Sequence, residues 1–263
     1  IAARVSAQVF WQAFSPLRDD SGQFLGAIPD FISKIISGET AGIFSRPYPY
    51  PDMTALVFTV AVFLIVVYFE AMRIEIPLSY GKYKGIRGRY PIKFIYASNI
   101  PMILTVALFA NVRVMAQLTN WGFLGTFTSD GNSVTGGLLY YLTPPTTLSG
   151  VYNEPIRGLV YLIIVVVFCV LFAKLWIELT NMGPKAVAKR LQGSGMQIPG
   201  FRKDIRILEK LLSRYIPQVT VMGGAFVGFI AVFADFTGAL GTGTGILLTV
   251  GIIYRMYEDL AKE

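Results

Sequence analysis

The sequence predicts an all-α fold, a polytopic transmembrane helical bundle, from its hydropathy, the length of its apolar runs and the alternation of charge between its loops. Of its 263 residues, 54% are hydrophobic and 15% charged, and the mean hydropathy is +0.56. A soluble domain carries about 25% charged residues, so the composition excludes an ordinary soluble protein. One cysteine and no histidine exclude an internal disulfide framework, His-based catalytic sites and His metal ligands.

The apolar runs predict five full spans and the end of a sixth. A helix crosses a bilayer with roughly 20 mostly apolar residues, and open sheets cannot cross because lipid leaves their edge groups unpaired. The predicted spans are residues 53–70, 94–118, 156–179, 215–236 and 237–257. Residues 1–17 are too short to span alone and lack an initiator Met, so we expect them to end a truncated helix of a longer protein.

The loops between these spans alternate in charge, which predicts their sides. The loop at 71–93, counted from Glu70, has six basic and two acidic residues, and the loop at 180–214, counted from Lys174, has nine and three. The loops at 18–52 and 119–155 each carry a net charge of −2. Because basic loops stay on the cytoplasmic side, we expect both basic loops and the tail at 258–263 in the cytoplasm and the other two loops outside.

Local patterns within the loops predict further elements. Apolar spacing at 24–37 indicates a helix at the outer interface. Alternating residues at 73–80 and 89–94, on either side of a glycine-rich basic tip, indicate a cytoplasmic hairpin. In the second basic loop we expect helices at 184–191 and 203–214, with a turn at 193–200. Three interpretations of the basic tips stay open: they fix topology, bind RNA phosphates, or bind lipid headgroups.

Polar groups within the spans argue against two classes of protein. No span carries an acid at mid-depth, which disfavours an ion-coupled transporter. The same absence, with no histidine, disfavours an intramembrane enzyme. The Gly/Thr run at 238–245 lacks a phosphate-loop lysine, so we expect a packed or distorted helix start there. Cys169 lies in an apolar run and is expected in the core or facing lipid.

Two long stretches resemble a known family. Residues 73–113, including NIPMIL at 99–104, resemble the sixth and seventh helices of the SecY family, the large subunit of the protein-conducting channel or Sec translocon. Residues 196–258, including IPGFRKD at 198–204 and GILLTV at 245–250, resemble its last loop and last two helices. The pattern is most similar to the archaeal branch. The resemblance implies a C-terminal half that starts within helix five, without helices one to four and the plug.

The resemblance also implies site residues, because the family encloses an hourglass pore between two pseudosymmetric halves. It implies a pore ring that includes Ile1, Ile103 and Leu248. The spans at 94–118 and 156–179 resemble one side of the lateral gate, with Asn111 as its polar residue. The implied ribosome-contacting residues of the two basic loops are Arg87, Arg89, Arg202 and Lys203.

The function implied by the resemblance is passage of secretory polypeptides through the apolar ring and release of transmembrane segments through the gate. We expect no catalysis, no metal and no cofactor. The implied partners are a SecE-type subunit, a small single-span subunit of the SecG or Sec-beta type, the ribosome, signal sequences, nascent polypeptides, the N-terminal half of the protein and membrane lipid. The expected location is the plasma membrane, with several spans and a cytoplasmic C-terminus. The alternatives are an inverted-repeat secondary transporter and a bare structural scaffold.

Overall fold

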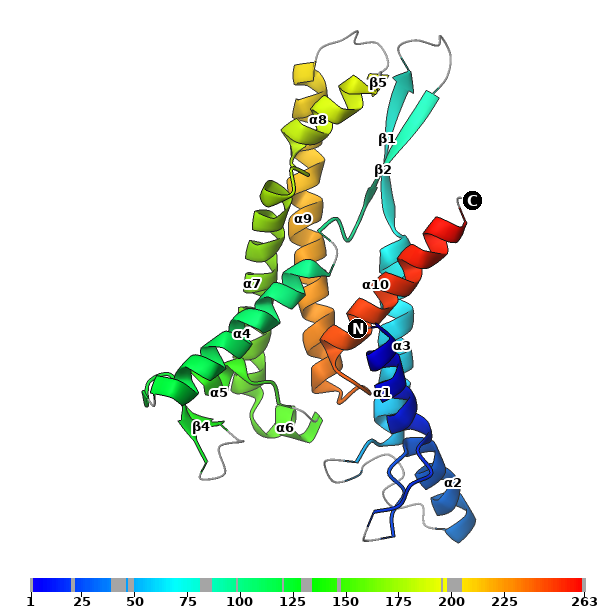
Figure 1. Ribbon diagram of the computed structural model, residues 1–263, viewed down its shortest axis with the longest axis vertical. Coiled ribbons are helices and arrows are strands. Elements are labelled where there is room, and N and C mark those ends of the chain that lie inside the picture. Colours follow the sequence, from blue (N-terminus) through cyan, green and yellow to red (C-terminus); the bar gives the residue numbers. More distant parts are fainter. Residues whose placement is uncertain are drawn as a thin grey trace.

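The computed structural model describes most of the chain as an elongated helical molecule (Figure 1). The described residues are 2–19, 22–38, 46, 50–80, 87–97, 99–119, 121–128, 134–145, 148–194, 196–197 and 205–261. The helices are α1 (Ala2–Phe14), α2 (Ala27–Ser37), α3 (Met53–Ala71), α4 (Ile100–Thr119), α5 (Leu138–Leu142), α6 (Leu148–Asn153), α7 (Pro155–Leu179), α8 (Pro184–Gly193), α9 (Ile205–Phe236) and α10 (Gly243–Leu260). The strands are β1 (Arg73–Tyr80), β2 (Arg87–Lys93), β3 (Thr126–Phe127), β4 (Val134–Gly136) and β5 (Met196–Gln197).

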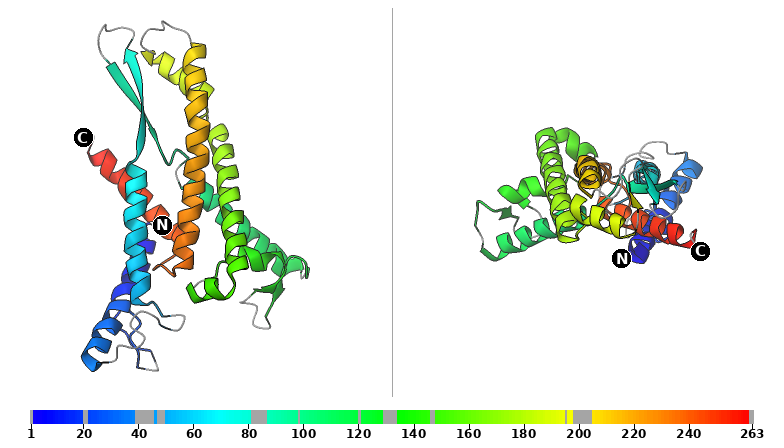
Figure 2. Two further views of the ribbon diagram at one scale, coloured as in Figure 1. Left: turned by 180° about the vertical axis from the view of Figure 1, so that it is seen from behind. Right: turned by 90° about the horizontal axis from the view of Figure 1, so that it is seen from above.

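The long helices α3, α7 and α9 run along the long axis, with α9 between the other two (Figure 2). One end of the molecule carries β1, β2, β5 and α8 and is called here the hairpin end (Figure 1). The opposite end carries α2, α5, α6 and the small β3–β4 sheet. The helix expected at 24–37 is α2, which begins at Ala27 and ends with Gly38 in the left-handed conformation.

Four helices in the described part of the chain are long and apolar enough to cross a membrane, namely α3, α4, α7 and α9. The fifth predicted span corresponds to α10, which is not among them. This helix begins at Gly243 rather than near residue 237, and its last turns carry Arg255, Glu258 and Asp259. The helix predicted at 237–257 is therefore present with a later start, and its crossing of the membrane stays a prediction.

Two other predicted boundaries also differ from the structure. The helix expected at 203–214 and the span expected at 215–236 form one continuous helix, α9, with Pro217 inside it. Pro217 removes one backbone hydrogen bond but packing keeps the helix continuous, since Ile216 and Val219 on either side are buried. The span expected from residue 94 begins at Ile100, because Phe94 still follows the hairpin and donates its backbone N–H to the Met72 carbonyl at 3.0 Å.

The helices α7 and α9 pack through glycines of α9. A Cβ at Gly224 would lie 3.0 Å from the Ala173 Cβ, and one at Gly228 would lie 3.2 Å from the Cys169 Sγ. Small residues four apart let helix backbones approach closely in a membrane protein. Cys169 is fully buried in this contact, so of the two expected positions it occupies the core.

The two basic loops meet in one sheet at the hairpin end. Strands β1 and β2 pair antiparallel from Arg73 opposite Lys93 to Ser79 opposite Arg87, which confirms the predicted hairpin. Strand β5, from the loop between α8 and α9, pairs with the far end of β1. The loops at 71–93 and 180–214 are therefore held together at the same end of the molecule.

The Gly/Thr run at 238–245 forms a tight turn that joins four helices. Gly238 and Gly241 have positive φ angles of 62° and 83°, which glycine adopts without a steric cost. The Leu240 N–H donates to the Thr59 Oγ1 of α3 at 2.8 Å, and the Gly243 N–H donates to the Asp235 Oδ1 of α9 at 2.8 Å. The expectation of a packed, distorted helix start is confirmed.

A tyrosine fixes the segment between β2 and α4 onto the turn between α7 and α8. In that turn Asn181 has a φ of 54°, and the Met182 N–H donates to the Ile177 carbonyl at 3.0 Å, which is a Schellman C-cap. The Tyr96 hydroxyl donates to the Met182 carbonyl at 2.9 Å. The end of α7 thus holds the approach to α4.

We expect Tyr96→Phe to lower the free energy of unfolding by about 1 kcal/mol, because the Met182 carbonyl loses its donor. Chemical denaturation of the detergent-solubilised protein measures this difference.

Burial, with a smaller effect of nearby Tyr90, raises the pKa of Tyr96 to about 12 from 10.0. The folded state then keeps the proton that the unfolded chain loses above pH 10, so stability falls between pH 10 and 12. The difference in free energy of unfolding between wild type and Tyr96→Phe should be complete below pH 10. An undiminished difference at pH 12 would contradict this assignment.

Candidate functional site

The N-terminal helix α1 lies antiparallel against the start of α10. A Cβ at Gly241 would meet the Val9 Cγ2 at 3.3 Å, and a Cβ at Gly245 would meet the Val5 Cγ1 at 3.0 Å. One further turn in the same direction leads along α10 to Leu248 and along α1 to its first residues. The predicted ring residue Ile1 itself lies outside the described residues.

The start of α4 is tied to the same part of α10. The Asn99 Nδ2 donates to the Leu247 carbonyl at 2.7 Å, with Asn99 only 5% exposed. Ile103 follows one helical turn after Asn99, and Leu248 directly follows Leu247. Three helices therefore converge at one level, near the middle of the molecule (Figures 1 and 2). Of these, α4 carries Ile103, α10 carries Leu248, and α1 directly follows Ile1 in the sequence.

The convergence leaves an apolar face that the described residues of this chain do not cover. Ile103 and Val106 on α4 are each 40% exposed, and Leu248 is partly exposed. Asn111 is exposed on the same helix, two turns beyond Ile103 along the same uncovered stripe. An apolar constriction disfavours a continuous chain of water or ions and gives no fixed grip on a passing solute. The face is thus suited to one side of a narrow apolar passage.

The hairpin end brings the predicted basic residues together only in part. Arg87 and Arg89 lie on β2, and the β1–β5 pairing holds the second basic loop beside that hairpin. Arg202 and Lys203, which belong to that second loop, lie outside the described residues.

A buried carboxylate joins the base of the hairpin to α10. Glu258 near the end of α10 forms ion pairs with Arg73 at the start of β1 and Lys93 at the end of β2. The Glu258 side chain is 9% exposed, while the two basic side chains are 38% and 36% exposed. The base of the hairpin therefore cannot move relative to α10 without breaking these pairs.

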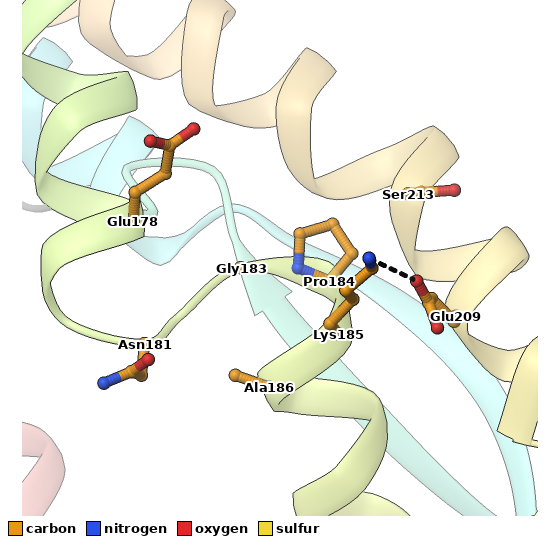
Figure 3. A pocket seen from close by; sticks show the side chains of 8 residues that line it. All are labelled: Glu178, Asn181, Gly183, Pro184, Lys185, Ala186, Glu209 and Ser213. Carbon is orange, nitrogen blue, oxygen red and sulfur yellow. Dashed lines mark ion pairs between the residues drawn. The ribbon is translucent and has the colours of Figure 1, made fainter.

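A shallow hollow lies beside this end, where α7 turns into α8 (Figure 3). Lys185 of α8 and Glu209 of α9 line it and form an ion pair at 3.9 Å. Glu178, in the last turn of α7, also lines it. The Lys185 side chain is 83% exposed. The pair is therefore mostly solvated and contributes little to stability.

Sequence reasoning missed the two polar ties of α10. The sequence patterns assign no contact to Asn99 and place Glu258 only in the predicted tail at 258–263. An asparagine directly before an Ile-Pro pair and an acid at the end of an apolar helix were the available signals. Neither indicates its partner, because Leu247 is 148 residues from Asn99 and Arg73 is 185 residues from Glu258.

The apolar helices and the uncovered apolar face at mid-height define a class of protein, namely a multi-pass helical membrane protein. The family model described as SecY matches residues 1–257. The chain belongs to the SecY family.

Individual relatives agree with this assignment. The chain is 49% identical to the protein translocase subunit SecY of Pyrococcus furiosus and 45% identical to that of Methanocaldococcus jannaschii. All of this chain is matched in both cases, but it spans only 58% and 57% of their lengths. These matches give no support to the transporter alternative.

Solved structures show the same fold. A structure titled as that of a protein-conducting channel has a TM-score of 0.80 and 44% identity. The match covers all of this chain and 57% of the chain in that structure. Sec61 in the canine ribosome–channel complex from the endoplasmic reticulum has a TM-score of 0.77 and 44% identity, with the same coverage.

We expect Glu258→Gln to free the hairpin from α10. Glutamine keeps the shape of the side chain but cannot pair electrostatically with Arg73 and Lys93. Trypsin should then cut the lysine- and arginine-rich hairpin faster, by roughly two- to fivefold at low salt, which corresponds to a charge pair that is only partly desolvated. Quantitative gel densitometry of the cleavage time course measures the rate.

The control for this variant is Glu209→Gln, which removes the exposed pair with Lys185 at the same end and should leave the rate unchanged. Raising the ionic strength should bring the wild-type rate toward that of Glu258→Gln, since salt screens the pairs. Equal cleavage rates of wild type and Glu258→Gln at low salt would show that the pairs do not hold the hairpin.

Proposed function

We propose that this chain forms the C-terminal part of the central subunit of a protein-conducting channel, which passes secretory polypeptides across the membrane. The observation that carries the proposal is the convergence of α1, α4 and α10 at one uncovered apolar level. Ile1, Ile103 and Leu248 then form part of the pore ring. The N-terminal half of the same protein completes the ring on the uncovered face.

The lateral gate in this proposal is formed by α4 and α7 on this side. Asn111 lies on the uncovered stripe of α4, where an amide pairs with a polar group of the other half. A cross-helix hydrogen bond of this kind contributes about 0.6–2 kcal/mol. That is small enough for an apolar signal sequence to offset by inserting between the helices, which releases transmembrane segments into lipid.

The hairpin end is the proposed cytoplasmic docking surface. Sec61, a neighbour in fold and sequence, occurs in a ribosome–channel complex, and the two basic loops of this chain carry the charge to bind rRNA phosphates. Arg87, Arg89, Arg202 and Lys203 are the proposed contacts, with the C-terminus on the same, cytoplasmic side. The channel lies in the plasma membrane with a SecE-type and a small SecG- or Sec-beta-type subunit.

The channel does no covalent chemistry in this proposal and needs no cofactor. A bound ribosome or another motor supplies the driving force for movement of the chain. The ring contributes a seal that disfavours ions and an apolar contact that slides along any sequence.

A photocrosslinker at Ile103 tests the ring. In the full-length protein, assembled with its partner subunits and holding an arrested secretory chain, we expect a strong crosslink from position 103 to that chain. A crosslinker at Asn111 should instead capture the signal sequence at an early stage of insertion. Gel shift of the radiolabelled arrested chain measures both.

Ile163 provides the matched control. It is also apolar and 51% exposed, but it lies on the face of α7 opposite to the residues that pack against α9. A crosslinker there should label lipid rather than the arrested chain. A signal at Ile163 equal to that at Ile103 would overturn the ring assignment.

Charge reversal tests the docking surface. The combined variant Arg87→Glu, Arg89→Glu, Arg202→Glu and Lys203→Glu should weaken ribosome binding by at least about tenfold and make it less dependent on salt, because each removed phosphate contact removes a released counterion. Co-sedimentation with ribosomes at several salt concentrations measures both effects. Arg18→Glu, at the opposite end, reverses a charge without changing binding. Unchanged affinity of the combined variant would refute this docking surface.

A further inference from the structure

Asn99 occupies the N-cap position of α4 but does not act as a cap. Its backbone carbonyl accepts the Ile103 N–H at 3.3 Å, the first bond of the helix. An N-cap asparagine normally accepts a hydrogen bond from the second or third helical N–H. Here the second helical residue is Pro101, which has no N–H, and the Asn99 Oδ1 accepts no bond in the described structure. The amide is therefore used for another purpose.

That purpose is a contact with the backbone of α10. The Asn99 Nδ2 donates to the Leu247 carbonyl at 2.7 Å, inside a site where Asn99 is 5% exposed and Leu247 is fully buried. One turn later on α10, a Cβ at Gly251 would lie 2.5 Å from the same Nδ2. The hydrogen bond and the missing side chain at Gly251 together fit the amide against one turn of α10.

This contact lies between two residues that packing holds only loosely. Ile103 is 40% exposed and Leu248 partly exposed, so neither side chain is held in place on all sides by neighbours in this chain. Asn99 is one turn before Ile103, and its acceptor Leu247 directly precedes Leu248. The distance between the two ring residues is thus set by the helix backbones that Asn99 joins.

We propose that Asn99, seated against Gly251, is the positioning residue of the pore ring and holds Ile103 and Leu248 at the spacing that seals the idle channel. The inference rests on the proposed function, since it takes both residues to be ring members. Beyond that function, the inference makes the seal depend on the hydrogen bond from Asn99 to the Leu247 carbonyl, although neither residue belongs to the ring.

The test uses the full-length channel with its partner subunits, reconstituted in vesicles. Anion efflux through the idle channel reports the seal. We expect Asn99→Leu and Asn99→Asp, neither of which keeps the amide donor, to raise efflux about three- to tenfold, the range that a cross-helix hydrogen bond supports. Gly251→Ala should raise it similarly, because the new methyl group displaces the amide. The double variant Asn99→Leu, Gly251→Ala should leak no more than the leakier single variant.

A distance measurement separates positioning from general loosening. Spin labels at Ala107 on α4 and Ile252 on α10, both on exposed positions, should give a narrow distance distribution in the otherwise unchanged channel and a broader or shifted one with Asn99→Leu. Thr220→Val is the control, because Thr220 is also buried but its hydroxyl donates to the Ile216 carbonyl of its own helix, α9, at 2.6 Å. It should change neither the efflux nor the distance.

The outcomes separate the inference from the proposed function. Efflux that rises with Ile103→Gly but stays at the wild-type level with Asn99→Leu and Gly251→Ala would overturn the positioning role and leave the ring intact. Additive effects of the two single variants would also overturn it. Efflux unchanged by Ile103→Gly, together with no crosslink from position 103, would refute the ring itself. If Asn99→Leu does not assemble, Gly251→Ala and the distance measurement decide the matter.

Discussion

The architecture depends on close backbone approach to α9. Three of its glycines and one alanine receive neighbouring segments: Gly224 and Gly228 receive α7, Gly223 lies against the Phe94 carbonyl, and the start of α10 lies against the Ala231 carbonyl. Apolar side chains gain little by leaving lipid for another helix, so van der Waals contact and hydrogen bonds must hold the helices together. Because α9 accepts α7 on one side and α10 on the other, it sets the positions of both.

The remaining order comes from a few polar ties. The turn at 238–245 bonds to α3, α9 and, through the Gly241 N–H and the Gln12 Oε1 at 2.7 Å, to α1. Asn99 joins α4 to α10 near the middle of the molecule, and Glu258 joins α10 to the hairpin. The helix α10 is thus bonded at mid-height beside the proposed ring and, about ten residues later, at the base of the proposed docking surface. The hairpin and the start of α4 are therefore both bonded to the same helix, α10.

Much of this could be predicted from residues alone, and the failures have physical causes. The hairpin at 73–93 was predictable because alternation and a glycine-rich tip are local properties. The continuity of α9 was not predictable, because Pro217 and the change from charged to apolar residues look like a boundary. In the structure the helix continues through Pro217, beside the buried Ile216 and Val219. The late start of α4 was hidden because residues 94–97 are apolar or aromatic and no charged residue separates them from the helix that follows.

The sequence by itself determined that the chain is a helical membrane protein, where its apolar segments lie and which loops are basic, since these follow from composition and short-range periodicity. Its long motifs were sufficient to indicate the SecY family. Only the tertiary structure decided that β5 joins the two basic loops and that α1, α4 and α10 converge. It also decided that Asn99 bonds to α10 and that Glu258 of α10 bonds to the hairpin. Those contacts join residues far apart in the chain, and no local pattern specifies which distant backbone or side-chain group a buried amide or carboxylate meets.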